Sequence, residues 1–303
     1  MKRRVLVTGA SGFIGRPLLR HLLERGFEVH ATALDALAGA EVVRDVVWHP
    51  LNLLDIGSHA TLFAAAQPTH LLHLAWNATP GVYWTTPENL RWVQASLALI
   101  EAFQACGGQR AVLAGSCAEY DWSHGFCSEQ ITPTRTKTLY SICKNSLWRM
   151  SEGFAARTGL SVASGRVFFL YGPHEYPNRL VPHVVRSLLR GEPAACSHGE
   201  QIRDFLHVDD VASGFAVLLA SDVTGVVNIA SGQPVRLREI IHALADQIGR
   251  RDLVRLGAVA VPPDEAPLVV ADVRRLTQEV GWTPRYDLPT GLEQTIQWWR
   301  DQS

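Results

Sequence analysis

The stretch VLVTGASGFIGRPL, residues 5–18, constrains the fold most, because it places three glycines between an apolar run and a segment with helical spacing. Glycine tolerates the backbone angles of a tight strand-to-helix turn, so Gly9 is expected to make that turn. Gly12 leaves room at the start of the helix, and Gly15 lets the helix pack closely against the strand. The pattern therefore predicts a strand, a turn and a helix in this order.

The turn also predicts a ligand. A helix N-terminus presents free N–H groups and the positive end of the helix dipole, which favour an anion such as the pyrophosphate of a dinucleotide. We therefore expect NAD or NADP at this turn, and the alternative is a turn with a structural role alone. The cofactor-binding residues expected here are Gly9, Ser11, Gly12, Phe13, Ile14 and Gly15.

Short β-branched runs alternate with helical segments along the first half of the chain. Strands are expected at residues 3–8, 28–33, 46–51, 69–76, 108–116 and 161–173, and long helices at 13–26, 87–108 and 137–159. Such alternation implies parallel pairing with right-handed crossovers. The expected fold is α/β, a Rossmann-type doubly wound parallel sheet with helices on both faces.

The rhythm changes after Pro173. Helical segments at 178–193, 204–221, 236–249 and 291–302 and a short apolar run at 225–231 do not extend one sheet simply. We interpret them as a smaller C-terminal α/β lobe that binds substrate. The expected domains are 1–173 for the dinucleotide and mainly 174–303 for the substrate, and we allow for segments that return to the first domain.

Composition excludes several classes of partner. The formal net charge is −1 and no basic stripe is visible, which argues against a nucleic-acid partner. No apolar run approaches the ~20 residues of a membrane span, and the run near the N-terminus is too short for a signal peptide. The five cysteines are scattered without a C-x-x-C pair, which favours free thiols in a reducing cytoplasm and no zinc or other metal.

Tyr140 and Lys144 lie four residues apart in an expected helix, so they share one face. A free phenol has a pKa of about 10, too high for proton transfer near neutrality. A neighbouring ammonium, together with the positive charge of an oxidised nicotinamide, lowers that pKa, and we expect Tyr140 to act as the acid/base with Lys144 beside it. The alternative is an ordinary surface pair.

Several motifs in order, TGASGFIG, LLHLAW, LYSICK, YGP and QIRDFLHVDDVA, resemble the extended branch of the short-chain dehydrogenase/reductase superfamily, the NAD-dependent epimerase/dehydratase family. The resemblance implies that Ser116, at the end of the fifth strand, aligns the substrate oxygen with Tyr140, and that Lys144 also holds the nicotinamide ribose. It adds further candidates for cofactor contact, which are Asn52, Leu53, Leu74 and Ala75, besides Tyr140 and Lys144.

The same resemblance implies substrate contacts and an assembly. Arg203 matches an arginine that contacts the diphosphate of a nucleotide-sugar, with a contact to Asp204 as the alternative. Asn178 and Arg179 lie where the family places substrate-lobe residues, with a polar loop as the alternative. Ser116 is also a candidate for substrate binding. A homodimer is implied through the long helices around residues 87–106 and 138–157.

Other positions depart from the family pattern. Cys117 and Ala118 replace the Asp-Glu pair that is usual in 4,6-dehydratases, so we disfavour dehydration, and Glu119 is shifted by one residue and is expected to point elsewhere. The substrate pocket is remodelled as well, at Phe169, Pro262 and Trp92. Trp76, Tyr83 and Trp84 follow the fourth strand and either stack on a ligand or pack in the core or a lid.

The choice between NAD and NADP depends on the residue at the end of the second strand, where NAD-binding proteins usually present an acid. Ala33 stands there, and Asp35 follows two residues later. If the loop is tight, Asp35 reaches the ribose and NAD is the alternative. With neither a clear acid at the strand end nor a convincing arginine in the loop, the sequence slightly favours NADP.

The resulting hypothesis is a cytoplasmic NAD(P)-dependent oxidoreductase acting at C4 of a nucleotide-activated sugar, as a 4-ketoreductase or a 4-epimerase. A non-catalytic dinucleotide-binding sensor or scaffold is the alternative.

Overall fold

A seven-stranded parallel sheet forms the centre of the computed structural model, which describes residues 3–34 and 43–302. Its strand order is β11-β7-β5-β4-β1-β2-β3. The strands are β1 Arg4–Thr8, β2 Glu28–Ala33, β3 Val46–Pro50, β4 His70–His73, β5 Arg110–Ser116, β7 Ser161–Val167 and β11 Gly225–Ile229. Five of the six strands predicted in the first half of the chain are confirmed, and the sixth, predicted over residues 161–173, ends at Val167. Residues 169–171 form a separate strand, β8 Phe169–Tyr171, which is not part of this sheet.

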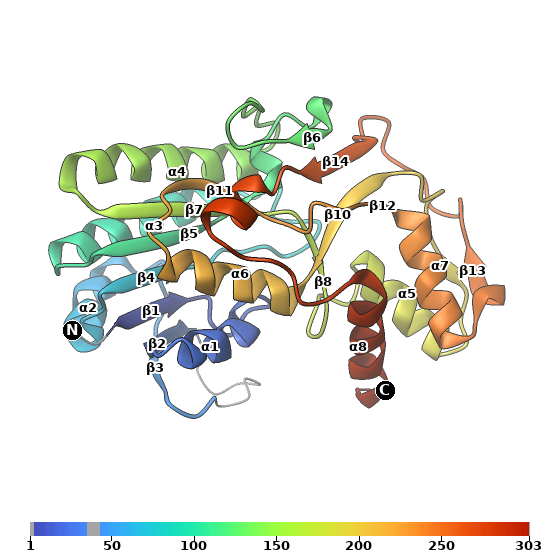
Figure 1. Ribbon diagram of the computed structural model, residues 1–303, viewed down its shortest axis with the longest axis horizontal. Coiled ribbons are helices and arrows are strands. Elements are labelled where there is room, and N and C mark those ends of the chain that lie inside the picture. The colour runs from blue at the N-terminus through green and yellow to red at the C-terminus, as the bar shows by residue number, and fades with distance from the viewer. Residues whose placement is uncertain (1–2, 35–42, 303) are drawn as a thin grey trace.

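Alternate residues of each strand supply two separate cores. Val5 and Val7 pack on one face of the sheet, and Leu6 packs on the other. Helices α1 and α6 cover the first face, and α2, α3 and α4 cover the second (Figure 1). The helices are α1 Gly15–Glu24, α2 His59–Ala66, α3 Glu88–Ala105, α4 Leu139–Thr158 and α6 Val208–Ala220. The predicted doubly wound α/β fold is confirmed.

The expected domains allowed for segments that return to the first domain without identifying them, and α6 and β11 are two such segments. β11 pairs in parallel with β7 and forms an edge of the large sheet, and α6 packs beneath the sheet beside α1. The sequence pattern missed this because the chain leaves the sheet after β7 and returns to it only at β11. Pairing between segments so far apart has no local signature.

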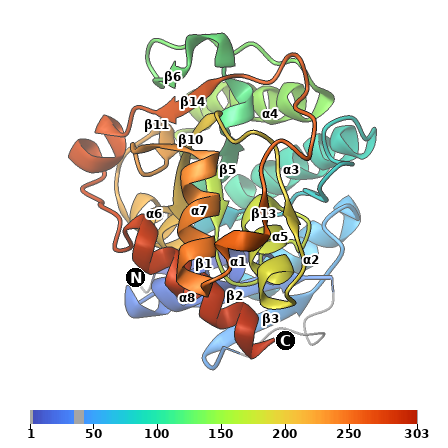
Figure 2. The ribbon, with the colours of Figure 1, turned by 90° about the vertical axis from the view of Figure 1, so that its right-hand side faces the viewer.

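A smaller lobe lies at the carboxyl ends of the large sheet's strands, to the right in Figure 1 and facing the viewer in Figure 2. Helices α5, α7 and α8 surround its apolar core. They are α5 Leu180–Leu189, α7 Leu237–Ile248 and α8 Leu288–Asp301. Its main sheet has the order β12-β10-β14-β6, with β8 paired to β10, and β9 and β13 form a separate pair. These strands are β6 Phe126–Cys127, β8 Phe169–Tyr171, β9 Ala194–Ala195, β10 Ile202–His207, β12 Pro234–Arg236, β13 Val254–Arg255 and β14 Leu268–Ala271.

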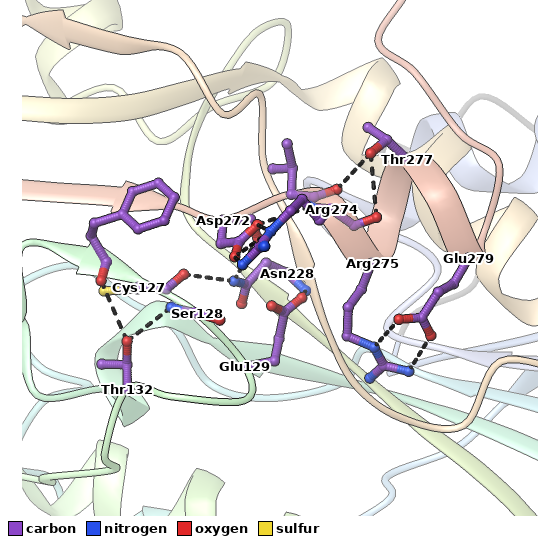
Figure 3. Close-up of polar contacts among 12 residues, drawn as sticks. Cys127, Ser128, Glu129, Thr132, Asn228, Asp272, Arg274, Arg275, Thr277 and Glu279 are labelled. Atoms are coloured by element: carbon purple, nitrogen blue, oxygen red, sulfur yellow. Dashed lines mark hydrogen bonds and ion pairs between the residues drawn. The ribbon is translucent and has the colours of Figure 1, made fainter.

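Asn228, fully buried on β11, ties the large sheet to the smaller one (Figure 3). Its Nδ2 donates to the carbonyls of Cys127 and Asp272, each at 3.0 Å. Its Oδ1 accepts from the Tyr120 hydroxyl at 2.8 Å, and its backbone N–H donates to Glu129 Oε1 at 2.8 Å. One amide side chain thus satisfies groups from β6, the residue after β14 and the segment after β5.

Within the described ranges, no helix combines the length and the apolar content that crossing a bilayer requires. The five cysteines are unpaired, and all except Cys106 are buried.

Replacement of Asn228 by Ala is expected to lower the free energy of unfolding by about 3 kcal/mol, because it removes three buried hydrogen bonds, to the Tyr120 hydroxyl and to the carbonyls of Cys127 and Asp272. Urea denaturation measures the loss. Gln130→Ala, at an exposed position of the same region, is the control and is expected to stay within about 0.5 kcal/mol of wild type. A loss below about 1 kcal/mol in N228A would contradict the linking role of Asn228.

Candidate active site

The glycine turn has the shape predicted from the sequence. Gly9 has φ +70°, and a Cβ placed on it would lie 2.8 Å from the backbone N of Ala75. A Cβ on Gly15 would lie 2.2 Å from the Gly9 carbonyl oxygen, so α1 packs directly on the turn. Gly12 is exposed, and its Cβ would approach only the Gly9 carbonyl, at 3.1 Å. The turn therefore leaves free space on the side of Gly12, where the first helix begins.

Other predicted cofactor residues surround this turn. Ser11, Phe13 and Ile14 lie within it and are partly buried, and Ala75 and Leu74 follow β4. The Leu74 N–H donates to the Thr8 carbonyl at 3.2 Å, which draws the end of β4 to the end of β1.

The loop after β3 is turned by Asn52, whose Oδ1 accepts the Leu54 N–H at 3.0 Å. The Asn52 side chain is exposed, whereas Leu53 is buried against the core. Ala33 ends β2, as the sequence alignment expected, and Asp35 lies outside the described residues.

A buried polar chain at the ends of β1 and β4 was missed by the sequence reasoning. The Thr8 hydroxyl lies 2.7 Å from His73 Nδ1, and His73 Nε2 lies 2.8 Å from the Ser96 hydroxyl. Burial lowers the pKa of His73 to about 3, and the charge of Lys144 adds to this effect. His73 is therefore a neutral bridge that joins the two strands to α3.

The predicted catalytic residues converge. Tyr140 and Lys144 lie in the first turns of α4, which starts at a capping box formed by Thr138 and Ser141. Both side chains are buried, with 9% and 7% of their surfaces exposed. Ser116, the last residue of β5, lies beside Tyr140, and its hydroxyl favours the phenolate form of Tyr140.

The Lys144 ammonium is held from two sides. Nζ donates to the Ala114 carbonyl at 3.0 Å and lies 4.0 Å from the centre of the Trp76 ring. Its distance to the centre of the Tyr140 ring is 6.0 Å. Burial lowers the pKa of Lys144 to about 7, and the charge of Glu119 opposes this shift. The protonation of Lys144 therefore changes near neutral pH.

The ammonium of Lys144 does not by itself lower the pKa of Tyr140 in this structure, and the further effect expected from the charge of an oxidised nicotinamide stays a prediction. Burial raises the pKa of Tyr140, and the Ser116 hydroxyl only partly offsets it. The physical reason is that the hydrogen bond of Lys144 goes to Ala114, so its charge does not contact the phenol oxygen directly. Tyr140 is therefore a neutral phenol, able to donate its proton.

The aromatic residues after β4 pack on these two side chains. Tyr83 and Trp84 meet the Tyr140 ring edge to face, with centroids 4.8 and 5.7 Å away, and the Trp84 carbonyl accepts the Tyr140 N–H. Trp76 stacks on Trp92 at 6.1 Å. The sequence left open whether these aromatic residues stack on a ligand or pack in the core or a lid. Their contacts in the structure are packing contacts around Tyr140.

The predicted substrate residues Asn178, Arg179 and Arg203 differ in exposure and in contacts. Arg179 is exposed, and its guanidinium lies 5.8 Å from the centre of the Tyr83 ring, so it approaches the aromatic wall of the site. Asn178 beside it is exposed. Arg203 is only 2% exposed, forms an ion pair with Glu265 and lies 5.3 Å from the centre of the Phe169 ring.

Arg203 does not contact Asp204, which was the alternative interpretation. The Asp204 carboxylate instead accepts hydrogen bonds from the Ser231 hydroxyl and N–H and from the Gly232 N–H. Asp204 therefore fixes the loop after β11.

Glu119 is the carboxylate that sequence reasoning assigned no role. It is fully buried, its Oε1 accepts the Ser116 N–H at 2.7 Å, and its Oε2 pairs with Arg166 at 2.9 Å. The spacing Ser-x-x-Glu of Ser116 and Glu119 is that of a capping box, a signal that was present in the sequence.

Comparison with known proteins gives consistent matches along the chain. Residues 5–230 match the model of the NAD dependent epimerase/dehydratase family. The dTDP-glucose 4,6-dehydratase of Streptomyces antibioticus is 30% identical over 317 residues, which cover 98% of this chain and 92% of the relative. The structure of MoeE5 in complex with UDP-glucuronic acid and NAD is 32% identical, with a TM-score of 0.86 over 99% of this chain and 100% of that one. The structure of the Thermus thermophilus UDP-glucose 4-epimerase in complex with NAD is 27% identical, with a TM-score of 0.85 over 99% and 100% of the two chains.

The neutral state of His73 predicts a pH dependence of stability. Its pKa is about 3 in the folded protein, below the ordinary value of 6.5 for histidine, so between these pH values the unfolded chain binds the additional proton. The free energy of unfolding therefore falls as the pH decreases below about 6.5, by up to about 1.4 kcal/mol per pH unit.

Replacement of His73 by Gln is expected to remove this part of the slope, measured by urea denaturation between pH 4.5 and 7. His124→Gln, at an exposed position, is the control and is expected to retain the slope. An unchanged slope in H73Q would show that His73 is not the group responsible.

Proposed function

Because the chain belongs to the NAD-dependent epimerase/dehydratase family, we propose that it is an NAD(P)-dependent oxidoreductase that transfers hydride at C4 of a nucleotide-activated sugar. The observation that carries this proposal is the convergence of Ser116, Tyr140 and Lys144, with the Ser116 hydroxyl beside the phenol and a buried ammonium next to them. Two separate segments, the end of β5 and the start of α4, therefore meet beside the strands that flank the glycine turn.

Tyr140, Ser116 and Lys144 have different roles in the proposed reaction. Tyr140 donates its phenol proton to the sugar oxygen during reduction and takes the proton back during oxidation. Ser116 holds that oxygen and the phenol in line. Lys144, while protonated, would stabilise the phenolate only together with the positive charge of an oxidised nicotinamide, because its own hydrogen bond goes to Ala114. A bound nicotinamide supplies the hydride donor or acceptor.

The free space beside Gly12 fits the pyrophosphate of such a cofactor, because a side chain there would fill it. Lys144 would hold the nicotinamide ribose. Asn52, Leu53, Leu74 and Ala75 would line the rest of the dinucleotide site, together with Ser11, Phe13 and Ile14. We propose NADP as the preferred cofactor, because β2 ends at Ala33 without an acid to bind the adenosine ribose diol. Parallel fluorescence titrations with NADH and NADPH measure that preference.

The residues at the positions where 4,6-dehydratases usually carry an Asp-Glu pair favour ketoreduction or epimerisation over loss of water. Cys117 and Ala118 follow Ser116 directly, and neither carries a carboxylate. Burial raises the pKa of the Cys117 thiol, so it remains protonated. The carboxylate of Glu119 is engaged by Arg166 and by the Ser116 N–H. Dehydration at C5 and C6 would lack its usual acid and base here.

The substrate is proposed to lie between Tyr140 and the smaller lobe. Arg179 and Asn178 would contact it from the segment before α5, and Arg203 would bind its diphosphate. A diphosphate that reaches Arg203 must compete with Glu265 for the guanidinium. A 4-ketoreductase exchanges cofactor at each turnover, whereas a 4-epimerase retains it, so the cofactor content of the purified protein distinguishes the two.

Tyr140→Phe is the direct test of the chemistry. The variant is expected to bind NADH or NADPH as wild type does and to lose at least about 1,000-fold in turnover, because the proton donor is gone. Ketoreduction is followed at 340 nm with the 4-keto forms of UDP-glucose, UDP-glucuronic acid and dTDP-glucose, and epimerisation of the three nucleotide-sugars, which returns the hydride and leaves no net change at 340 nm, is followed by chromatography of the sugar product. Retained turnover in Y140F would exclude acid/base catalysis by this phenol, and cofactor binding without turnover in wild type would favour a sensor or scaffold.

We also propose a homodimer through α3 and α4, which pack on each other at one side of the molecule. Leu90 on α3 and Ile142 and Met150 on α4 are large apolar side chains that are 53%, 44% and 53% exposed. Such residues on neighbouring helices are suited to contact with a second copy.

Met150→Glu is expected to convert this dimer into a monomer, because it buries a charge in the apolar contact. Light scattering coupled to size-exclusion chromatography measures the mass. Ile131→Glu is the control, since Ile131 is 75% exposed and lies outside both helices. A monomeric wild type, or a dimer that M150E leaves intact, would contradict the proposed interface.

A further inference from the structure

We propose that Glu119 is a positioning residue of the active site, which holds the backbone of Ser116 in place and keeps Lys144 protonated. The expected effect of Glu119 on turnover rests on the proposed function. The contacts of Glu119 are part of the folded structure and do not depend on that function.

Glu119 reaches the end of β5 through the short helix η2, Cys117–Glu119. Its Oε1 accepts the Ser116 N–H at 2.7 Å, while the Ser116 hydroxyl accepts the Ala118 N–H at 3.2 Å. This reciprocal pair fixes the backbone angles of Ser116 and therefore the direction of its side chain. The same Ser116 hydroxyl interacts with the Tyr140 phenol, so the Glu119 carboxylate fixes the geometry of the proposed proton path.

The neighbouring residues are shaped around this carboxylate. A Cβ on Gly115 would lie 2.9 Å from Glu119 Oε1 and 2.7 Å from Ser164 Oγ, so glycine is needed for the carboxylate to approach the strand. Arg166 on β7 binds Oε2 through both Nε and Nη2, at 3.0 and 2.9 Å. Its guanidinium lies 4.4 Å from the centre of the Tyr120 ring. Glu119 is consequently held in one position by both oxygens.

The charge of Glu119 acts on Lys144. The titratable groups that face Lys144 are Glu119 on η2, His73 on β4 and Tyr140 on its own helix. His73 and Tyr140 are neutral, so Glu119 is the negative charge among these three groups. Burial lowers the pKa of Lys144 to about 7 while Glu119 raises it, and without that carboxylate the ammonium would be lost at a lower pH.

A substitution can separate the charge from the hydrogen bond. Glu119→Gln keeps an oxygen that can accept the Ser116 N–H, but it removes the negative charge and leaves the cation of Arg166 in place. Both changes disfavour the protonated form of Lys144. The midpoint of its titration is expected to fall by about one to two pH units.

The chain allows this midpoint to be measured directly, because it contains three lysines, Lys2, Lys137 and Lys144. Protein labelled with ¹³C at the lysine Cε gives one NMR signal for each, and a Lys144→Met sample assigns the signal of interest. In wild type the Lys144 signal is expected to titrate near pH 7. No substrate or cofactor is needed, so the result is independent of the proposed reaction.

Glu129→Gln is the matched control. Glu129 Oε1 also accepts a backbone N–H, that of Asn228 at 2.8 Å, and its carboxylate faces Arg274 and Arg275 (Figure 3). It is not among the groups that face Lys144. The Lys144 midpoint is expected to be unchanged in E129Q.

A midpoint in E119Q that equals the wild-type midpoint would overturn the proposal. Should E119Q not fold, Arg166→Gln tests the same interaction with the opposite sign, because Glu119 then acts on Lys144 without a counter-ion and the midpoint is expected to rise. A midpoint that stays unchanged or falls in R166Q also overturns it.

Once a substrate is known, the alkaline limb of the kcat/KM profile is expected to shift with the NMR midpoint in E119Q. A shifted midpoint in a protein that turns over no nucleotide-sugar would leave the role of Glu119 intact and refute the proposed function alone.

Discussion

The burial of one ammonium group, that of Lys144, is the constraint on which the rest of the site depends. An ammonium is costly to remove from water unless hydrogen bonds and charges compensate for it. The Ala114 carbonyl, the Trp76 ring and the Glu119 carboxylate are the partners that do so, and they come from β5, the loop after β4 and η2. These segments meet because parallel strands end at the same edge of the sheet.

This arrangement explains why the Tyr140 phenol and the Lys144 ammonium change protonation at different pH values. Tyr140 is enclosed by Tyr83 and Trp84, and burial keeps it protonated, whereas Lys144 changes protonation near neutral pH. A proton donor that remains neutral beside a cation of adjustable charge is suited to reduction of a carbonyl. In the reverse direction Tyr140 can accept a proton after a charge that develops nearby has favoured its phenolate form.

Much of this could be predicted from the sequence, because the signals are local. The glycine spacing, the strand periodicity and the pair Tyr140 and Lys144 on one helix each depend on a few consecutive residues. The packing of α6 and β11 on the large sheet could not be predicted, since it joins segments far apart in the chain. The ion pair between Arg203 and Glu265 and the direction of the pKa shift at Tyr140 depend on burial, which no short motif encodes.

The central claim is that hydride leaves C4 of a nucleotide-activated sugar while Tyr140 handles the proton. The most direct measurement is a single-turnover experiment in which the protein is loaded with oxidised cofactor and mixed with UDP-glucose carrying hydrogen or deuterium at C4. The account predicts a transient at 340 nm that rises several-fold more slowly with deuterium. Equal rates, or no reduced nicotinamide with this sugar or with the other nucleotide-sugars tested, would contradict it.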